Sequence, residues 1–440
     1  MEDVFGPRIF KTAEVFGVST EILEPSYVDR GALDSEIQKY LSRDIHIALR
    51  GESKCGKSWL RKRNIPNALT VQCRLNKSVA DIYVDALSQL GIKLTLETTE
   101  KSVLKGSVEA SGEVGVKLLA KIGLKLASAK ENERSNKMQS VGHNISDLRY
   151  ISEIINASER RLVIEDFHYL SPEERQSLAF DLKALWDYGT YAVLIGIWAE
   201  NNLLLHLNPD LAARVHEVSI FWSNTDLQKV IDKGSAALKI ELDPTIIAKC
   251  VEISFGTVGI LQKLLIEYLD ICQVVQTQKQ LLKLAGAEKF ETAAMTYADQ
   301  LNAIYQTFAT RVAKGIRTRA KSTGIYAHML AVILDADDAS LSRGLPLNDI
   351  YARANKREPR VQKGNLRTVL ERLDGLQIDE QGRGLILTYD SFPEIVSVVD
   401  KQLLLYRRYA TVRWPWEDLI ESVEATHTGY DPESPASGFS

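Results

Sequence analysis

The sequence predicts an α/β fold built on a parallel five-stranded sheet, with helical segments after it. Short apolar, strand-like segments alternate with amphipathic helical segments through the first half of the chain, as in sheets whose strands are joined by crossover helices. A glycine-rich loop directly follows the first of these strands, and an acidic pair ends the third. Because ligands bind beyond the carboxyl ends of parallel strands, both features predict a site at one edge of the sheet.

The composition is that of an ordinary soluble protein of about two to four domains. The 440 residues are 45% hydrophobic and 25% charged, with a formal net charge of -4, which excludes wholesale disorder and a global basic field for nucleic acid. Four scattered cysteines exclude a disulfide framework. No signal peptide and no apolar run of about 20 residues is present. We expect a cytoplasmic protein without a membrane span.

The first strand is expected at residues 45–50, and the loop after it has the pattern GxxxxGK[ST]. Its glycines let the backbone turn so that N–H groups point at phosphate oxygens, and the following helix N-terminus adds to the anion site. Lys57 is predicted to reach the β- and γ-phosphates and Ser58 to ligate Mg²⁺. The predicted phosphate-binding residues are Gly51, Glu52, Ser53, Lys54, Cys55, Gly56, Lys57 and Ser58.

An acidic pair follows the third expected strand, at 161–164; the second is expected at 68–74. One carboxylate can hold Mg²⁺ while its neighbour orients or deprotonates a water. By position, Glu165 is the magnesium-side acid and Asp166 the water-activating one. The alternative is an acidic strand end that only caps the next helix.

The remaining strands complete the sheet. Residues 191–198 are almost unbroken apolar sequence, as expected for a strand covered on both faces, and a helix is expected before them at 172–187. Residues 217–221 form a last short strand. The predicted core therefore has five strands.

The order of these motifs resembles the AAA+/STAND branch of P-loop ATPases, with a polar tip, Glu200-Asn201-Asn202, after the fourth strand. Residues 163–170 are similar to Walker B segments of bacterial STAND-like and origin-recognition-like ATPases. Tyr27-Val28-Asp29-Arg30 resembles the box that packs on adenine before the first strand. The resemblance covers about 27–269 and extends weakly to 409. It implies ATP and Mg²⁺ as cofactors, with Tyr27, Val28 and Arg30 on the adenine side.

The resemblance also implies roles for residues outside these motifs. Asn201, or Glu200 beside it, is implied as the sensor that orients the attacking water. Arg214, just before the last strand, is implied as an arginine finger, a role often filled across subunits of an oligomer; the alternative is a surface ion pair. In the helical lid, Gln262 and Lys263 stand where many relatives carry a sensor arginine.

Residues 95–144 are an insertion outside the minimal core, rich in small residues and then in lysines interleaved with leucine and isoleucine. Such a pattern fits a membrane-surface helix. An element packed on the core or on a neighbour is favoured.

The C-terminal part is predicted to be a winged-helix domain. Helices are expected at 326–334, 347–354 and 364–373, followed by a hairpin of strands 376–379 and 385–389. Its basic bias suits duplex DNA, while a protein effector is the alternative partner. The expected DNA contacts are Lys356, Arg357, Arg360, Lys363 and Arg367.

The resulting domain organisation is an N-terminal segment (1–30), the ATPase-like core (31–225), a helical lid with connecting helices (226–322), the winged helix (323–410) and a tail (411–440) with a disordered end. The resemblance implies an ATP-hydrolysing switch that forms a homo-oligomer on ATP binding, with a DNA-associated, mobile-element or phage-defence role. The alternative is a nucleotide-gated DNA- or protein-binding adaptor with little turnover.

Overall fold

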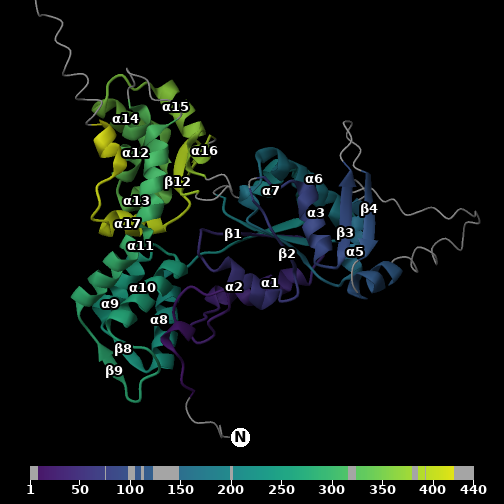
Figure 1. Cartoon of the computed structure of the whole chain (residues 1–440), viewed down its shortest axis with the longest axis horizontal. Helices are drawn as coiled ribbons and strands as arrows, with labels where there is room; N and C mark the ends of the chain where they lie inside the picture. Colours follow the sequence, from purple (N-terminus) through teal and green to yellow (C-terminus); the bar gives the residue numbers. More distant parts are fainter. Residues whose placement is uncertain are drawn as a thin grey trace, which may run out of the picture. The chain divides into compact units, whose positions relative to one another are not determined.

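The computed structural model describes residues 8–74, 76–97, 105–110, 113–121, 148–198, 202–315, 324–378, 385–391 and 393–420. The chain divides into two compact units (Figure 1). The sheet unit comprises Ser19–Ile22 and Tyr27–Asp226, and the helical unit comprises Met1–Val18, Leu23–Ser26 and Leu227–Ser440. Among the described residues, no helix has both the length and the apolar character needed to cross a membrane.

The sheet unit is built on a parallel five-stranded sheet with the strand order β2-β5-β6-β1-β7. The last strand begins two residues earlier than expected and ends before Ile220. The sheet confirms the predicted α/β class. The strands are β1 (His46–Arg50), β2 (Leu69–Gln72), β5 (Leu162–Glu165), β6 (Ala192–Gly196) and β7 (Val215–Ser219).

The register of the sheet brings the predicted motifs to one edge. Arg50, the last residue of β1, lies beside Gly196 of β6 and Ser219 of β7. Glu165, the last residue of β5, lies beside Gln72 of β2. The glycine-rich loop and the acidic pair therefore leave the same carboxyl edge, with the end of β6 between them.

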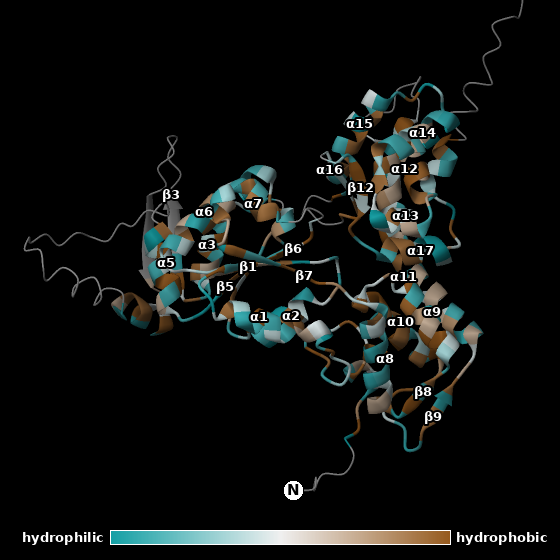
Figure 2. Ribbon diagram, turned by 180° about the vertical axis from the view of Figure 1, so that it is seen from behind, coloured by the Kyte–Doolittle hydropathy of each residue, from teal (hydrophilic) through white to brown (hydrophobic). Residues whose placement is uncertain are grey.

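Helices cover both faces of this sheet (Figure 1), which explains why β6 is buried along its whole length. Strand β6 is correspondingly apolar (Figure 2). Capping side chains fix two helix starts: Ser78 forms a capping box with Asp81, and Ser171 caps a helix that begins at Pro172. The helices are α1 (Leu33–Leu41), α2 (Lys57–Asn64), α3 (Val79–Ser88), α5 (Leu148–Ala157), α6 (Pro172–Asp187) and α7 (Leu203–Leu207).

The described part of the insertion packs on the core. Strands β3 (Ile92–Glu97) and β4 (Lys105–Ala110) form an antiparallel hairpin, and a helix at 113–121 follows. Leu118 on that helix is buried in the same apolar cluster as Ile92 and the residues of α3. The favoured interpretation is thus confirmed for this part, while 122–147 lie outside the described residues.

The helical unit begins with a bundle that the N-terminal segment joins. Thr12 Oγ1 donates to Val274 O at 2.6 Å, and the Phe16 ring packs against Gly234, where a Cβ atom would lie 2.2 Å from the ring. The bundle elements are α8 (Asn224–Leu238), β8 (Ile240–Leu242), α9 (Pro244–Ile253), α10 (Val258–Ile271), β9 (Leu282–Leu284) and α11 (Ala287–Lys314).

The C-terminal elements differ from the predicted hairpin. The expected strand 376–379 is wrong at its start, because α16 (Leu373–Gln377) is helical there. The Gln377 amide oxygen accepts from the N–H groups of Ile386 and Leu387, and its NH₂ group donates to Leu387 O, so the side chain takes the place of a neighbouring strand. Residues 379–384 lie outside the described part of the chain.

The observed hairpin pairs β11 (Leu387–Asp390) with β12 (Ile395–Val398), and β10 (Leu345–Pro346) pairs with the other edge of β12. The three expected helices are present, and the winged-helix assignment stays a prediction. The helices of this region are α12 (Ile325–Leu334), α13 (Asp338–Arg343), α14 (Leu347–Arg357), α15 (Lys363–Glu371) and α17 (Gln402–Tyr409).

A buried histidine makes the stability of the sheet unit depend on pH. His46 Nε2–H donates to Leu182 O at 2.9 Å, and Nδ1 accepts from the Ala192 N–H at 2.9 Å, which fixes the neutral tautomer. Burial lowers the pKa of His46 to about 4, and the Arg161 charge acts in the same direction. Because an unfolded histidine has a pKa of about 6.5, the unfolded state takes up this proton first as pH falls.

We therefore expect the free energy of unfolding to fall between pH 6.5 and 4, by up to about 1.4 kcal/mol per pH unit from this group. Urea unfolding across this range should give a shallower pH slope for His46→Gln than for the wild type. Equal slopes would show that His46 is not the neutral, buried group described.

Candidate nucleotide site

The loop from Gly51 to Gly56 is closed tightly between β1 and α2. The Gly51 N–H donates to Gly196 O at 3.2 Å, which anchors the loop to the end of β6. A Cβ atom on Gly51 would lie 2.6 Å from Cys55 Sγ and 3.0 Å from Ile220 Cβ, so no larger residue fits. Gly56 has φ 90° directly before α2, a left-handed conformation that favours glycine. Glycine is therefore required on steric grounds at Gly51 and favoured by the backbone conformation at Gly56.

Lys57 folds back over this loop. Its Nζ donates to Gly51 O at 2.8 Å and to Glu52 O at 2.5 Å. Both partners are neutral backbone carbonyls, so no carboxylate neutralises the ammonium group through these bonds, and phosphate oxygens can replace these acceptors. Ser58, in the first turn of α2, is exposed, and its hydroxyl has no hydrogen bond to any described residue. The pair fits a phosphate with its metal ion.

Glu165 faces the helix that follows the loop. Its carboxylate accepts from Arg61 Nε on α2 at 3.1 Å, and the two side chains are 17% and 14% exposed. This ion pair joins β5 to the P-loop helix directly. The structure therefore brings the predicted magnesium-side acid to the helix that follows the phosphate loop.

Asp166 points to the other side of β5. It has φ 58°, an unusual value for a residue other than glycine. Its Oδ2 accepts from Gln72 Nε2, at the end of β2, at 2.9 Å. The two neighbouring acids thus have different partners, and Asp166 is held beside β2 rather than toward the loop.

His168 lies in the short 3-10 helix Phe167–Tyr169, directly after the acidic pair. Its Nδ1 accepts from the Ile197 N–H at 3.3 Å. Burial, and then the charges of Lys57 and Arg175, lower the pKa of His168 to about 3, so the ring is neutral at neutral pH. Within the described ranges, no group of three or more His, Cys, Asp or Glu residues is placed to hold a metal ion. His168 is therefore a neutral, buried residue beside the acidic pair.

The predicted adenine-side residues have unequal roles. Tyr27 donates its hydroxyl to both Asp34 oxygens at 2.9 and 2.8 Å, and its ring lies 4.4 Å from the Arg63 guanidinium. Burial and then the Asp34 contact raise the pKa of Tyr27. Tyr27 is thus fixed by α1 and α2, while Val28 beside it is half-buried.

Arg30 is the unusual member of this group. It is only 7% exposed, its guanidinium stacks 4.2 Å from the Trp222 ring, and Nε and Nη2 have no hydrogen-bond partner among the described residues. Burial lowers the pKa of Arg30. Because unpaired buried donors are costly, a ligand acceptor here would be stabilising.

Trp222 connects Arg30 to the phosphate loop. Its Nε1 donates to Cys55 O at 2.8 Å. Trp222 was not predicted as a site residue, because its only signal in the sequence is an aromatic side chain directly after the last expected strand.

The implied arginine finger is not brought to the loop, and the implied sensor cannot be placed. Glu200 and Asn201 lie outside the described residues. Arg214 precedes β7, and its main-chain oxygen accepts from the His46 N–H at 2.8 Å, so it lies at the amino edge of the sheet, opposite the loop. Its guanidinium bonds Asp210 O and lies 4.7 Å from the Trp186 ring. Arg214 is thus remote from this chain's own phosphate loop, and a role across subunits stays a prediction.

The side chains of the two lid residues, Gln262 and Lys263, bind other residues of the helical unit. Gln262 accepts from the Gly17 N–H at 3.0 Å and donates to Ser26 Oγ at 3.1 Å. Lys263 pairs with Glu267. Neither side chain stands free as a sensor cation.

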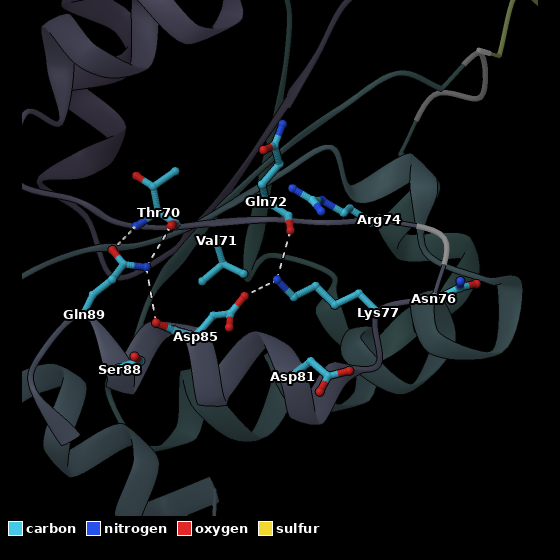
Figure 3. Close-up of a pocket in the computed structure, with 10 residues that line it drawn as sticks. All are labelled: Thr70, Val71, Gln72, Arg74, Asn76, Lys77, Asp81, Asp85, Ser88 and Gln89. Carbon is cyan, nitrogen blue, oxygen red and sulfur yellow. Dashed lines mark hydrogen bonds and ion pairs between the residues drawn. The ribbon is translucent and has the colours of Figure 1, made fainter. Parts of the chain in front are cut away.

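A polar groove of about 660 Å³ lies beside the edge strand β2 (Figure 3). Gln89 bonds both the N–H and the C=O of Thr70, at 3.2 and 2.9 Å, and Lys77 bonds Gln72 O at 3.1 Å. These side chains satisfy the outward backbone groups of an edge strand. The groove is therefore a protected sheet edge.

The expected DNA-contact residues of the C-terminal region are partly neutralised. Three arginines have acidic partners: Arg357 with Asp335, Arg360 with Glu358 and Arg367 with Glu394. The Arg360 hydrogen bond lowers the pKa of Glu358 to about 2. The remaining two, Lys356 and Lys363, form no ion pair with any residue that the structure describes.

No protein-family model matches the sequence, and no curated protein matches it. Among solved structures, the chain is similar to a Walker-type ATPase of Pyrococcus abyssi (14% identity, TM-score 0.47, covering 87% of this chain and 96% of that one). It is also similar to the Aeropyrum pernix Orc1 protein in complex with DNA (11%, 0.43, 94% and 98%) and to a STAND protein with a tetratricopeptide repeat sensor from Pyrococcus horikoshii (13%, 0.36, 96% and 47%). At such scores these likenesses add no argument about function. The chain's own strands show an α/β core with a parallel five-stranded sheet.

Proposed function

We propose that the chain is a Mg²⁺-dependent ATPase of the AAA+/STAND type that acts as a nucleotide-driven switch. The observation that carries the proposal is the Arg61–Glu165 ion pair, which holds the acidic strand end against the helix of the phosphate loop. A loop that merely joins strand and helix would need neither Lys57 at its mouth nor an acid beside that helix.

The residues divide the work of phosphoryl transfer. Lys57 exchanges the carbonyls of Gly51 and Glu52 for β- and γ-phosphate oxygens. Ser58 and Glu165 hold Mg²⁺, which when bound supplies positive charge to the phosphate oxygens. Asp166, released from Gln72, orients the attacking water and accepts its proton.

The nucleoside end is assigned to Arg30. Its two unpaired donors bind acceptor atoms of the nucleotide, and Trp222 transmits that contact to the loop through Cys55 O. Assembly into a homo-oligomer lets Arg214 act on a neighbouring subunit's nucleotide.

Lys57→Ala is expected to abolish ATP binding, because the ammonium group is the fixed cation of the loop. Titration with a fluorescent ATP analogue measures this, and Lys39→Ala, which changes an exposed lysine on α1, is the matched control. ATP binding by Lys57→Ala as tight as by the wild type would refute the phosphate-loop assignment.

Asp166→Asn is expected to keep ATP binding and to lower turnover by about 10²–10⁴-fold, the usual contribution of a general base. Phosphate release at saturating ATP checks it, with Asp187→Asn, an exposed acid on α6, as control. Unchanged turnover would transfer the role of base to Glu165 or to another group.

A second candidate function is a nucleotide-gated adaptor for DNA or a protein effector with little turnover. The bond from Gln72 to Asp166 favours it, as does the use of Gln262 and Lys263 inside the helical unit. In this reading nucleotide binding, not hydrolysis, controls the partner.

Steady-state phosphate release with and without duplex DNA separates the two functions. The ATPase proposal predicts multiple turnover in at least one condition, whereas the absence of turnover in both conditions favours the adaptor.

If duplex DNA is the partner, the double variant Lys356→Ala/Lys363→Ala should lower the salt dependence of DNA binding, measured as the slope of log K against log salt concentration, by about 2. The control double variant Lys249→Ala/Lys283→Ala should leave this slope unchanged. An equal salt slope for the two double variants would show that Lys356 and Lys363 do not contact the DNA.

A further inference from the structure

One carboxylate in the middle of β7 binds groups at the end of β1 and in the segment after β6. Glu217, in β7, is 9% exposed in its side chain. Its two oxygens accept from the Asn202 N–H at 3.0 and 3.1 Å, and Oε2 accepts from Trp198 Nε1 at 3.1 Å. Arg50 Nε lies 3.2 Å from Oε1. Glu217 was not singled out by the sequence, because nothing in its local pattern marks it.

These partners belong to the segments that form the candidate site. Arg50 is the residue directly before Gly51, and it also donates to Ser219 Oγ at 2.7 Å. Trp198 and Asn202 flank the tip that follows β6. Glu217 therefore ties the entry to the phosphate loop to both sides of that tip.

Trp198 extends the connection to the acidic pair. Its ring lies over Gly196, where a Cβ atom would come within 2.7 Å of it. The same ring meets Phe167 edge to face at 6.0 Å between centroids, and Phe167 directly follows Asp166. A continuous set of contacts thus runs from Glu217 through Trp198 to the acidic pair.

The arrangement is specific to a carboxylate. Bonds from an indole, a backbone amide and a guanidinium to one shielded anion are charge-assisted and mutually reinforcing. A glutamine amide in its place keeps one acceptor oxygen, but its NH₂ group would face the N–H donors that now bind the carboxylate. The carboxylate thus fixes relative positions that neutral substitutes cannot hold.

We infer that Glu217 is a positioning residue for the proposed phosphoryl transfer: it fixes the end of β6 and, through Trp198, the acidic pair relative to the phosphate loop. This inference rests on the proposed function. It assigns Glu217 no contact with the nucleotide, so its removal should affect the reaction more than binding.

The test compares Glu217→Gln and Glu217→Ala with wild type. Affinity for a fluorescent ATP analogue should stay within about threefold, since ground-state binding is retained. Turnover at saturating ATP should fall by about tenfold or more for Glu217→Gln and further for Glu217→Ala, because small misplacements of catalytic groups cost up to about 10²-fold. The matched control is Glu36→Gln, which should behave as wild type. Glu36 is also an acid that contacts β7, because it lies beside His216 of that strand.

Hydrogen exchange keeps the inference testable apart from turnover. In both Glu217 variants the Asn202 amide and peptides covering 166–170 should exchange faster, with β2 unchanged. Wild-type protein that binds ATP without any turnover would refute the proposed hydrolysis, while the exchange pattern still decides the coupling. Turnover and exchange equal to wild type, or a parallel loss of affinity, turnover and melting temperature, would overturn the positioning role.

Discussion

The candidate site depends on one constraint of the sheet: β1 and β5 run parallel and end at the same edge, separated only by β6. This order brings a loop that begins at Gly51 and an acidic pair at Glu165 together, although more than a hundred residues separate them in sequence. The Arg61–Glu165 ion pair then closes the gap between strand and helix. A different strand order would leave a phosphate loop without its acid.

The phosphate loop could be predicted from the sequence because all its determinants are contiguous: a strand, two glycines, a lysine and a serine before a helix. The direction of the Asp166 side chain could not be predicted, because it depends on Gln72 of the neighbouring strand. A local sequence pattern does not reveal which strands are neighbours in the sheet. Trp222 and Glu217 were missed for the same reason. The strand expected at 376–379 failed because the Gln377 amide serves the backbone of β11 from within a helix, which an alternating pattern cannot reveal.

The divergence of the two acids is the feature that most shapes the function. Glu165 faces the helix after the loop, whereas Asp166 is held by Gln72 in a left-handed conformation. Such a conformation persists only where the surroundings compensate for it, so a modest rearrangement at the end of β2 would change the Asp166 position. A site with its metal-side acid in place and its second acid turned away fits a protein that binds nucleotide readily and hydrolyses it under control.

The most direct measurement is a crystal structure of the chain with Mg²⁺ and a non-hydrolysable ATP analogue. The account predicts that Lys57 Nζ leaves Gly51 O and Glu52 O for the phosphate oxygens, with Mg²⁺ about 2.1 Å from Ser58 Oγ and Glu165 facing the ion. Nucleotide bound elsewhere, or a loop in which Lys57 keeps its carbonyl partners beside a bound nucleotide, would contradict it.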